Sequence, residues 1–123
     1  MGLYDAILIK ENHIIAAGSI ANAVIQSRRQ FPDKMIEVEV ENLPQIQQAL
    51  QAGAHRLLLD NMSVEQLREA VQQATGRAEL EASGGITLDN VRDIALTGVD
   101  FISIGSITKN INAVDLSMRF EFD

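Results

Sequence analysis

The feature that most constrains this chain is a repeat in which short apolar runs alternate with segments of helical spacing. Each run is bounded by polar residues or glycine and has the length of a β-strand. The runs cover residues 6–9, 35–40, 56–59, 79–82 and 101–104. The last four start at residues 35, 56, 79 and 101, so that 21 to 23 residues separate one start from the next. This spacing suits one strand, one helix and two short loops, and it predicts repeated βα units in a parallel sheet.

Four segments between the strands carry apolar residues three and four positions apart, the period of a helix with one buried face. These residues are Ile20, Ala23 and Val24; Leu43, Ile46 and Leu50; Leu67, Ala70, Val71 and Ala74; and Leu88, Val91 and Ala95. Ser63 and Gln66 form a capping-box pattern, and Thr87 can cap the fourth helix. Glycines suited to a left-handed helix end stand at Gly53, Gly76 and Gly98.

Parallel strands covered by helices form either an open doubly wound sheet or part of a closed barrel, and the periodicity alone does not separate the two. We favour an incomplete α/β barrel because polar and glycine residues gather where the strands end, and barrel enzymes build their sites at those ends. The strand ends carry Lys10, Glu39 and Glu41, Asp60, Ser83 with Gly84 and Gly85, and Gly105 with Ser106.

Charge and composition exclude several classes of function. The chain has 10 Lys and Arg against 17 Asp and Glu, a formal net charge of -7, and no basic run is interleaved with aromatic residues, so nucleic-acid binding is not expected. It has no cysteine and no apolar stretch of the roughly 20 residues that cross a bilayer. We therefore expect a cytoplasmic protein that does not enter the membrane.

Residues 37–41 alternate strictly between glutamate and valine, which places three carboxylates on one face of the strand. In a half-exposed strand such carboxylates simply face water. In a barrel strand they point inward and must be paired, hydrated or functional. Glu39 and Asp60, at neighbouring strand ends, could accept hydrogen bonds from sugar hydroxyls or hold Mg²⁺.

Two glycine-containing turns and one lysine complete the predicted site. Ser83-Gly84-Gly85 precedes a helix and Gly105-Ser106 follows the next strand, so bare backbone N–H groups could approach a phosphate from two loops. Lys10 could hold a phosphate or a carboxylate as a point charge. The structural alternatives are an ordinary tight turn and a solvated lysine.

The stretch GLYDAILIKENH at residues 2–13 closely resembles the quinolinate phosphoribosyltransferase family, in which Gly-Leu-x-Asp runs into Lys-Glu/Asp-Asn-His. Further segments match the family in the same order along the whole chain: EVEVE at 37–41, LDN at 59–61, SGG at 83–85, TGVDFIS at 97–103 and AVDLS at 113–117. The resemblance implies that residues 1–123 are the C-terminal part of an α/β-barrel catalytic domain, without the family's N-terminal domain and first barrel elements.

The resemblance also implies roles for single residues. Lys10 would contact the anionic substrates, and Glu39 and Asp60 would bind the ribose hydroxyls of phosphoribosyl pyrophosphate, directly or through Mg²⁺. The 5-phosphate would lie against Ser83, Gly84, Gly85, Ile104, Gly105 and Ser106, with Lys109 adding charge nearby. The implied reaction transfers the phosphoribosyl group to quinolinate and releases pyrophosphate and carbon dioxide, a step of NAD biosynthesis.

The chain departs from the family pattern at its start. Family members carry a His-Arg pair before Gly-Leu-x-Asp, and upstream Arg and Lys residues clamp the quinolinate carboxylates, whereas Met1 precedes Gly2 here. Lys10 is a poor substitute for such bidentate clamps, so the isolated chain is expected to be inactive. Unpaired strand edges and uncovered apolar surface predict a homo-oligomer.

Three alternatives remain at this point. A related phosphoribosyltransferase-like protein with another ring acceptor, such as the relatives associated with molybdenum transport, would keep the same phosphoribosyl half-site. A non-catalytic fragment could assemble with a longer homologue. A generic phosphate-binding α/β domain would need only the glycine turns and would leave Lys10, Glu39 and Asp60 unexplained.

Overall fold

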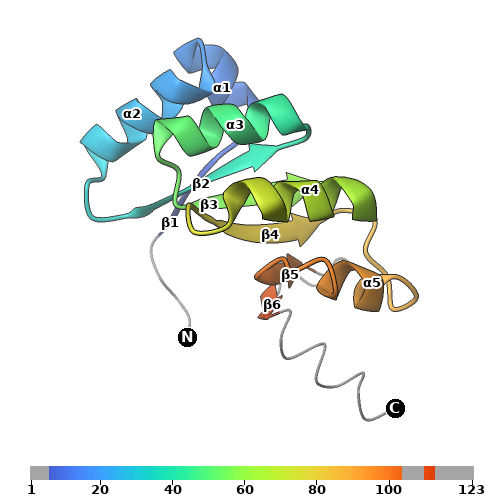
Figure 1. Cartoon of the computed structure of the whole chain (residues 1–123). Helices are drawn as coiled ribbons and strands as arrows, with labels where there is room; N and C mark the ends of the chain where they lie inside the picture. The colour runs from blue at the N-terminus through green and yellow to red at the C-terminus, as the bar shows by residue number, and fades with distance from the viewer. Residues whose placement is uncertain (1–5, 104–109, 113–123) are drawn as a thin grey trace.

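The computed structural model describes residues 6–103 and 110–112, which form strands and helices in alternation (Figure 1). The elements, in chain order, are β1 (Ala6–Ile9), α1 (Glu11–Ala17), α2 (Ile20–Gln30), β2 (Met35–Val40), α3 (Leu43–Ala52), β3 (Arg56–Asp60), α4 (Val64–Ala74), β4 (Glu79–Ser83), α5 (Val91–Ala95), β5 (Phe101–Ser103) and β6 (Asn110–Asn112). No helix in these ranges is long and apolar enough to cross a membrane.

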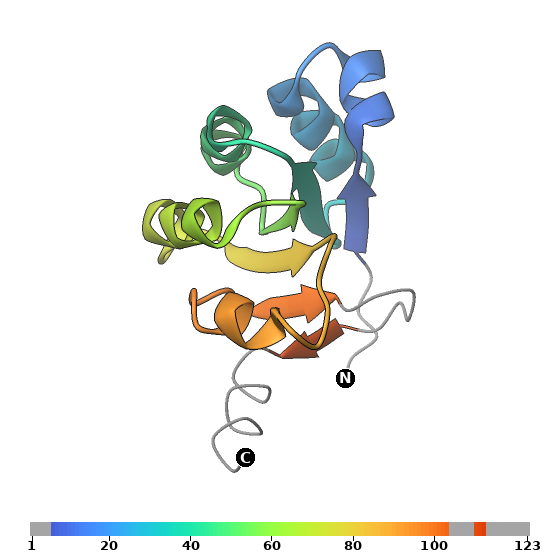
Figure 2. The same ribbon diagram turned by 90° about the vertical axis from the view of Figure 1, so that its right-hand side faces the viewer.

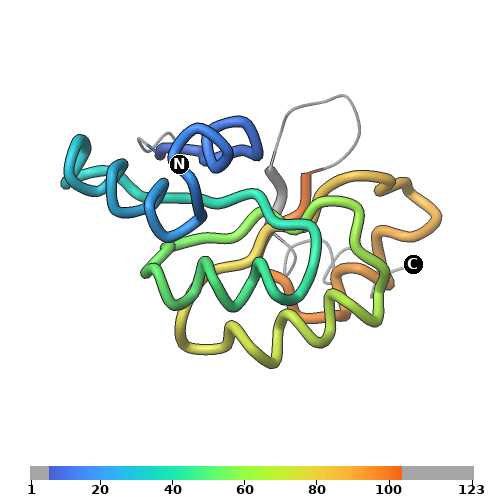
Figure 3. Tube along the Cα trace, turned by 90° about the horizontal axis from the view of Figure 1, so that it is seen from above, coloured from blue at the N-terminus to red at the C-terminus, as the bar shows by residue number. Residues whose placement is uncertain are grey.

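The strands form one sheet in the order β1-β2-β3-β4-β5-β6. The first five run parallel, and β6 returns antiparallel to β5. Each strand lies beside its neighbour in sequence, and α3 and α4 lie on the same side of the strands (Figures 2 and 3). A doubly wound sheet would reverse its strand order at a switch point, whereas a sequential order with helices on one side is the barrel arrangement. The predicted repeat of βα units in an incomplete, open barrel is therefore confirmed.

The hydrophobic core lies between the sheet and its helices. The strand residues that point toward the helices are almost completely buried: Ile36, Val38, Val40, Leu57, Leu59, Leu80, Ala82 and Ile102. They pack with helix residues at the predicted period, among them Ala23, Val24, Ile46, Ala49, Leu67 and Ala70. The other sheet face is only partly covered, because Leu8 there remains 40% exposed and Glu79 is exposed as well.

Most predicted boundaries agree with the structure. β1 and β2 have the predicted ends, while β3 and β4 each extend one residue further, to Asp60 and Ser83. The predicted capping box is present: Ser63 Oγ accepts a hydrogen bond from Gln66 N at 3.2 Å, and Gln66 Oε1 accepts one from Ser63 N at 2.9 Å. Of the three predicted glycines, Gly53 caps α3 in the left-handed conformation, and the other two adopt positive φ beyond the ends of their helices.

The prediction for the fourth helix was wrong at its start. The helix begins at Val91 rather than near Thr87, and Leu88 is 82% exposed instead of packing inward. Asn90 explains the difference, because its side chain accepts a hydrogen bond from Thr87 N at 2.8 Å and donates one to Gly85 O at 2.9 Å. These bonds close a turn before the helix, so that Thr87 lies in the turn and does not cap α5.

Candidate functional site

The predicted site residues that the structure describes come to one edge of the sheet. Lys10 follows β1, Glu39 lies near the end of β2, and Asp60 and Ser83 are the last residues of β3 and β4. The parallel register pairs Glu39 with Leu58 and Asp60 with Ser83. The predicted residues Ile104, Gly105, Ser106 and Lys109 lie outside the described ranges, so their roles stay predictions.

The ends of β3 and β4 are joined by direct contacts. Ser83 Oγ donates a hydrogen bond of 3.4 Å to Asp60 Oδ1, and Asn61 N donates one of 3.0 Å to Ser83 O. Gly84 has a φ of +80°, and a Cβ atom there would lie only 2.9 Å from Asp60 Oδ1. Both the conformation and the space require glycine, so that the backbone of the turn stays bare next to the Asp60 carboxylate.

Glu39 is half-buried and lies within electrostatic reach of two other site residues. Burial raises the pKa of its carboxyl group, the charge of Asp60 raises it further, and the ammonium of Lys10 opposes the shift. Lys10 itself is exposed and stands at the N-terminal end of α1. The edge therefore holds two mutually repelling carboxylates with one cation nearby, an arrangement that hydroxyl donors or a metal ion would relieve.

The donor set at this edge fits Mg²⁺ only in company with a ligand. Among the residues that the structure describes, no group of three or more histidine or carboxylate side chains could hold a metal ion. Mg²⁺ is often bound by one or two carboxylates and completed by water and substrate phosphates. Glu39 and Asp60 can supply such carboxylates, while the remaining oxygens would have to come from a bound phosphate compound and water.

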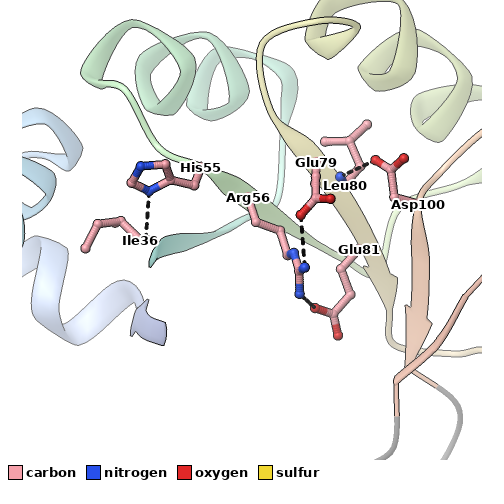
Figure 4. Close-up of polar contacts among 7 residues, drawn as sticks. All are labelled: Ile36, His55, Arg56, Glu79, Leu80, Glu81 and Asp100. Atoms are coloured by element: carbon pink, nitrogen blue, oxygen red, sulfur yellow. Dashed lines mark hydrogen bonds and ion pairs between the residues drawn. The ribbon is translucent and has the colours of Figure 1, made fainter. Parts of the chain in front are cut away.

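A buried charge network lies on the same sheet face, below the strand ends (Figure 4). Arg56 and Glu79 are the first residues of β3 and β4, whereas Asp60 and Ser83 are the last. Arg56, only 4% exposed, places Nη2 at 3.0 Å from Glu79 Oε1 and Nη1 at 3.9 Å from Glu81 Oε1. Its Cζ atom lies 4.1 Å from the centre of the Phe101 ring. Ser103 Oγ donates a short hydrogen bond to Glu81 Oε2. The network connects β3, β4 and β5 beneath Asp60 and Ser83.

Glu37 joins this network from β2. Its register partner is Arg56, its side chain is 9% exposed, and its Oε2 atom has no hydrogen-bond partner among the described residues. Burial and the neighbouring Glu81 carboxyl group raise the pKa of Glu37 to about 8, although the charge of Arg56 acts in the opposite direction. Burial and the neighbouring Glu81 thus favour the neutral, protonated form of this inward carboxyl group.

Sequence reasoning did not identify the network. The apolar pattern of the run at 56–59 rests on its three leucines and predicts no role for Arg56, its first residue. A partial signal was present, since Glu37 and Glu81 lie on the acidic face of alternating strands, and Arg56 opens the strand between them. A charged residue at such a position in a barrel strand calls for an opposite charge on the neighbouring strand.

At the opposite end of the sheet, side chains accept hydrogen bonds from backbone N–H groups. Ile36 N donates a hydrogen bond of 2.9 Å to His55 Nδ1, and Leu80 N donates one of 2.8 Å to Asp100 Oδ2 (Figure 4). A cavity of about 520 Å³ lies at this end, lined by residues that include Gly76, Arg77 and Glu79. It is separated from the strand ends that carry Glu39 and Asp60 by the length of the strands, so the cavity is not part of the candidate site.

Comparison with known proteins places the chain in a family. Residues 1–119 match the family model described as quinolinate phosphoribosyl transferase, C-terminal domain. A Synechocystis protein named probable nicotinate-nucleotide pyrophosphorylase [carboxylating] is 43% identical over 123 residues, which cover 97% of this chain and 42% of that protein. The chain thus spans about two fifths of the length of this relative.

Solved structures agree with this result. The nicotinate-nucleotide pyrophosphorylase from Francisella tularensis superposes with a TM-score of 0.81 at 49% identity, covering 90% of this chain and 41% of that one. A thiamine phosphate pyrophosphorylase from Pyrococcus furiosus, 24% identical, superposes with a TM-score of 0.65 over 81% of this chain and 48% of that one, which supports the fold alone. The chain therefore belongs to the quinolinate phosphoribosyl transferase family and matches the model of its C-terminal domain.

Proposed function

We propose that this chain is the C-terminal part of the α/β-barrel catalytic domain of an enzyme that transfers a phosphoribosyl group to quinolinate in NAD biosynthesis. The ring nitrogen of quinolinate bonds to the anomeric carbon as the bond from that carbon to pyrophosphate breaks. One carboxyl group then leaves as carbon dioxide, and a proton takes its place on the ring carbon to give nicotinate mononucleotide. Family membership supports this assignment, as do relatives named carboxylating nicotinate-nucleotide pyrophosphorylase.

The observation that carries the proposal is the contact between the ends of β3 and β4. Asp60, Ser83 and Gly84 adjoin one another, and the carboxylate of Glu39 lies within electrostatic reach from β2. A ribose 5-phosphate presents hydroxyl donors and an anion, which match the acceptors and the backbone donors at this edge. Asp60 and Glu39 would accept from the ribose hydroxyls, and the N–H groups of the glycine turn would donate to the 5-phosphate.

The carboxylates have a second effect on the reaction. Positive charge develops at the anomeric carbon as pyrophosphate departs, and Glu39 and Asp60 favour that charge through space. Bound Mg²⁺ would neutralise charge on the pyrophosphate. Lys10, exposed at the same edge, would attract the anionic substrates, and Ile104, Gly105, Ser106 and Lys109 would complete the phosphate site.

The remaining parts of the proposal concern location and assembly. We place the enzyme in the cytoplasm as a homo-oligomer. Among the described strands β1 pairs only with β2, and the partly covered sheet face retains exposed Leu8, so both features favour further protein contacts.

Calorimetric titration with phosphoribosyl pyrophosphate and Mg²⁺ tests the half-site in this chain. The variants Glu39→Gln and Asp60→Asn keep the side-chain shape and remove the charge, and we expect each to weaken binding about tenfold or more. Glu69→Gln removes an exposed carboxylate on α4 and serves as the matched control with unchanged affinity. Quinolinate in a parallel titration is expected not to bind. The proposal is wrong if the wild-type chain does not bind the donor or if both site variants bind it normally.

A further inference from the structure

Asn61 has an unusual position in the described part of the chain. It follows Asp60 directly, and its φ of 55° makes it the non-glycine residue with a left-handed conformation among residues 6–103 and 110–112. Its backbone N–H donates to Ser83 O at 3.0 Å, which fixes the residue against β4. Asparagine tolerates this conformation better than most residues, so the backbone by itself accounts for the residue type. The side chain supplies the further observation.

The amide of Asn61 lies across the start of the glycine turn. A Cβ atom on Gly84 would lie 2.6 Å from Asn61 Oδ1 and 2.9 Å from Asp60 Oδ1, and a Cβ atom on Gly85 would lie 3.6 Å from Asn61 Oδ1. Asn61 therefore stands next to both groups of the proposed half-site, the carboxylate of Asp60 and the bare backbone of the turn.

The hydrogen-bonding capacity of this amide is not used within the described structure. Asn61 is exposed, and its side chain makes no hydrogen bond to any residue in the described ranges. The amide oxygen is the atom nearest to Gly84. Since no hydrogen bond to a described residue fixes this amide, a half turn about its Cβ–Cγ bond brings the N–H₂ group to the same place. An asparagine amide has two donors, whereas its neighbours Asp60 and Glu39 are acceptors when ionised.

We propose that Asn61 is a further substrate-binding residue, whose amide N–H₂ donates a hydrogen bond to the 5-phosphate of the phosphoribosyl group at the Gly84-Gly85 turn. This inference rests on the proposed function. A phosphate bound there lies close to the Asp60 carboxylate, so it needs donors that offset the repulsion between the two anions. A neutral amide supplies one such donor beside the backbone N–H groups, and it brings no negative charge of its own.

Two substitutions separate binding from a purely conformational role. Asn61→Gly accepts the positive φ without strain and removes the amide, while Asn61→Asp has nearly the same shape, tolerates the left-handed conformation and replaces the donor by a negative charge. If Asn61 served only to hold the backbone, Asn61→Gly would bind like the wild type, whereas the new charge of Asn61→Asp would repel the phosphate in either case. We expect both to lose affinity for phosphoribosyl pyrophosphate with Mg²⁺, Asn61→Gly by about tenfold and Asn61→Asp by more.

The experiment is calorimetric titration of the folded variants, checked by circular dichroism, with phosphoribosyl pyrophosphate and, separately, ribose 5-phosphate. Asn22→Asp introduces the same charge change on α2 and should bind like the wild type. Equal losses for both ligands are expected because both carry the 5-phosphate, whereas a loss confined to the pyrophosphate compound contradicts the assignment. Normal wild-type binding together with unchanged binding by Asn61→Gly contradicts the inference alone. A wild-type chain that binds neither ligand contradicts the proposed function and this inference together.

Discussion

Glu37→Gln should make the protein more stable at neutral and alkaline pH. In the folded chain burial and Glu81 raise the pKa of the Glu37 carboxyl group from 4.5 to about 8. If Glu37 and Glu81 were both ionised, the single cation Arg56 would face two buried carboxylates in addition to the exposed carboxylate of Glu79. Protonation of Glu37 lowers this excess of negative charge. Glutamine imitates the protonated form, since it is neutral and can donate to the Glu81 carboxylate.

The sign of the pH effect follows from proton linkage. Because the folded pKa lies above the unfolded one, the native state binds the Glu37 proton more tightly. Its contribution to stability is fully present below about pH 4.5 and is lost as the pH rises through about 8. At 1.36 kcal/mol per tenfold change in proton affinity, the upper bound between pH 5 and pH 8 is roughly 4 kcal/mol. Relaxation around the buried group reduces this bound, and we expect about 2 kcal/mol.

Urea unfolding of the wild type and Glu37→Gln at pH 5, 6, 7 and 8 measures the effect, since their difference cancels the other titrating groups. The free energy of unfolding of the variant, relative to the wild type, should rise by about 2 kcal/mol from pH 5 to pH 8. Glu69→Gln, at an exposed site on α4, should show no such trend. A difference between Glu37→Gln and the wild type that stays constant over this range would refute the reasoning.

Three further changes have defined outcomes. Gly84→Ala should weaken binding of phosphoribosyl pyrophosphate in calorimetry by tenfold or more, because a Cβ there lies 2.6 Å from Asn61 Oδ1, whereas Gly76→Ala has a similar φ and nothing within 4 Å and should bind normally. Leu57→Ala removes a fully buried side chain and should lower the free energy of urea unfolding by about 2–5 kcal/mol; a loss below 1 kcal/mol contradicts the assigned core. Ser63→Ala breaks the capping box and should cost about 1 kcal/mol in the same assay, and an unchanged midpoint contradicts its role.

The strands could be predicted from the sequence. In an alternating strand such as β2, the sequence also predicted which side chains face the core, because every second residue points to the same side of the sheet. The pattern at 37–41 correctly separated Val38 and Val40, which are fully buried, from Glu39 on the other face. Strand spacing also predicted the βα repeat. The choice between a doubly wound sheet and a barrel required the strand order, which depends on contacts between distant segments.

One helix, one helix boundary and the Arg56 network were harder to predict, because the local sequence around each carries little information about them. α1 has seven residues, none of them fully buried, and only Ile14 and Ala17 of these pack against the core, so its apolar face is too short for a periodic pattern to reveal it. The start of α5 was misplaced because Leu88 fits the helical period, while the side chain of Asn90 stabilises a turn at that point. The Arg56 network depends on register between β2, β3 and β4, which a single sequence does not specify.

The prediction that Lys10, Glu39, Asp60, Ser83 and Gly84 would meet at one edge succeeded for a simple reason. Parallel strands deliver their C-terminal ends to the same side, so residues at those ends come together whatever the helices do. Asn61 belongs to the LDN segment, but the sequence alone does not predict a role for it, because its left-handed conformation and its approach to Gly84 depend on the three-dimensional structure.

The central claim is that the phosphoribosyl group binds at the C-terminal ends of β2, β3 and β4. Backbone amide chemical shifts of the ¹⁵N-labelled chain, followed during titration with phosphoribosyl pyrophosphate and Mg²⁺, test this location most directly. The account predicts that the largest shifts occur at residues 60–61 and 83–85. Shifts concentrated at the opposite end of the sheet, around the cavity lined by Gly76, Arg77 and Glu79, or no saturable shifts at all, would contradict it.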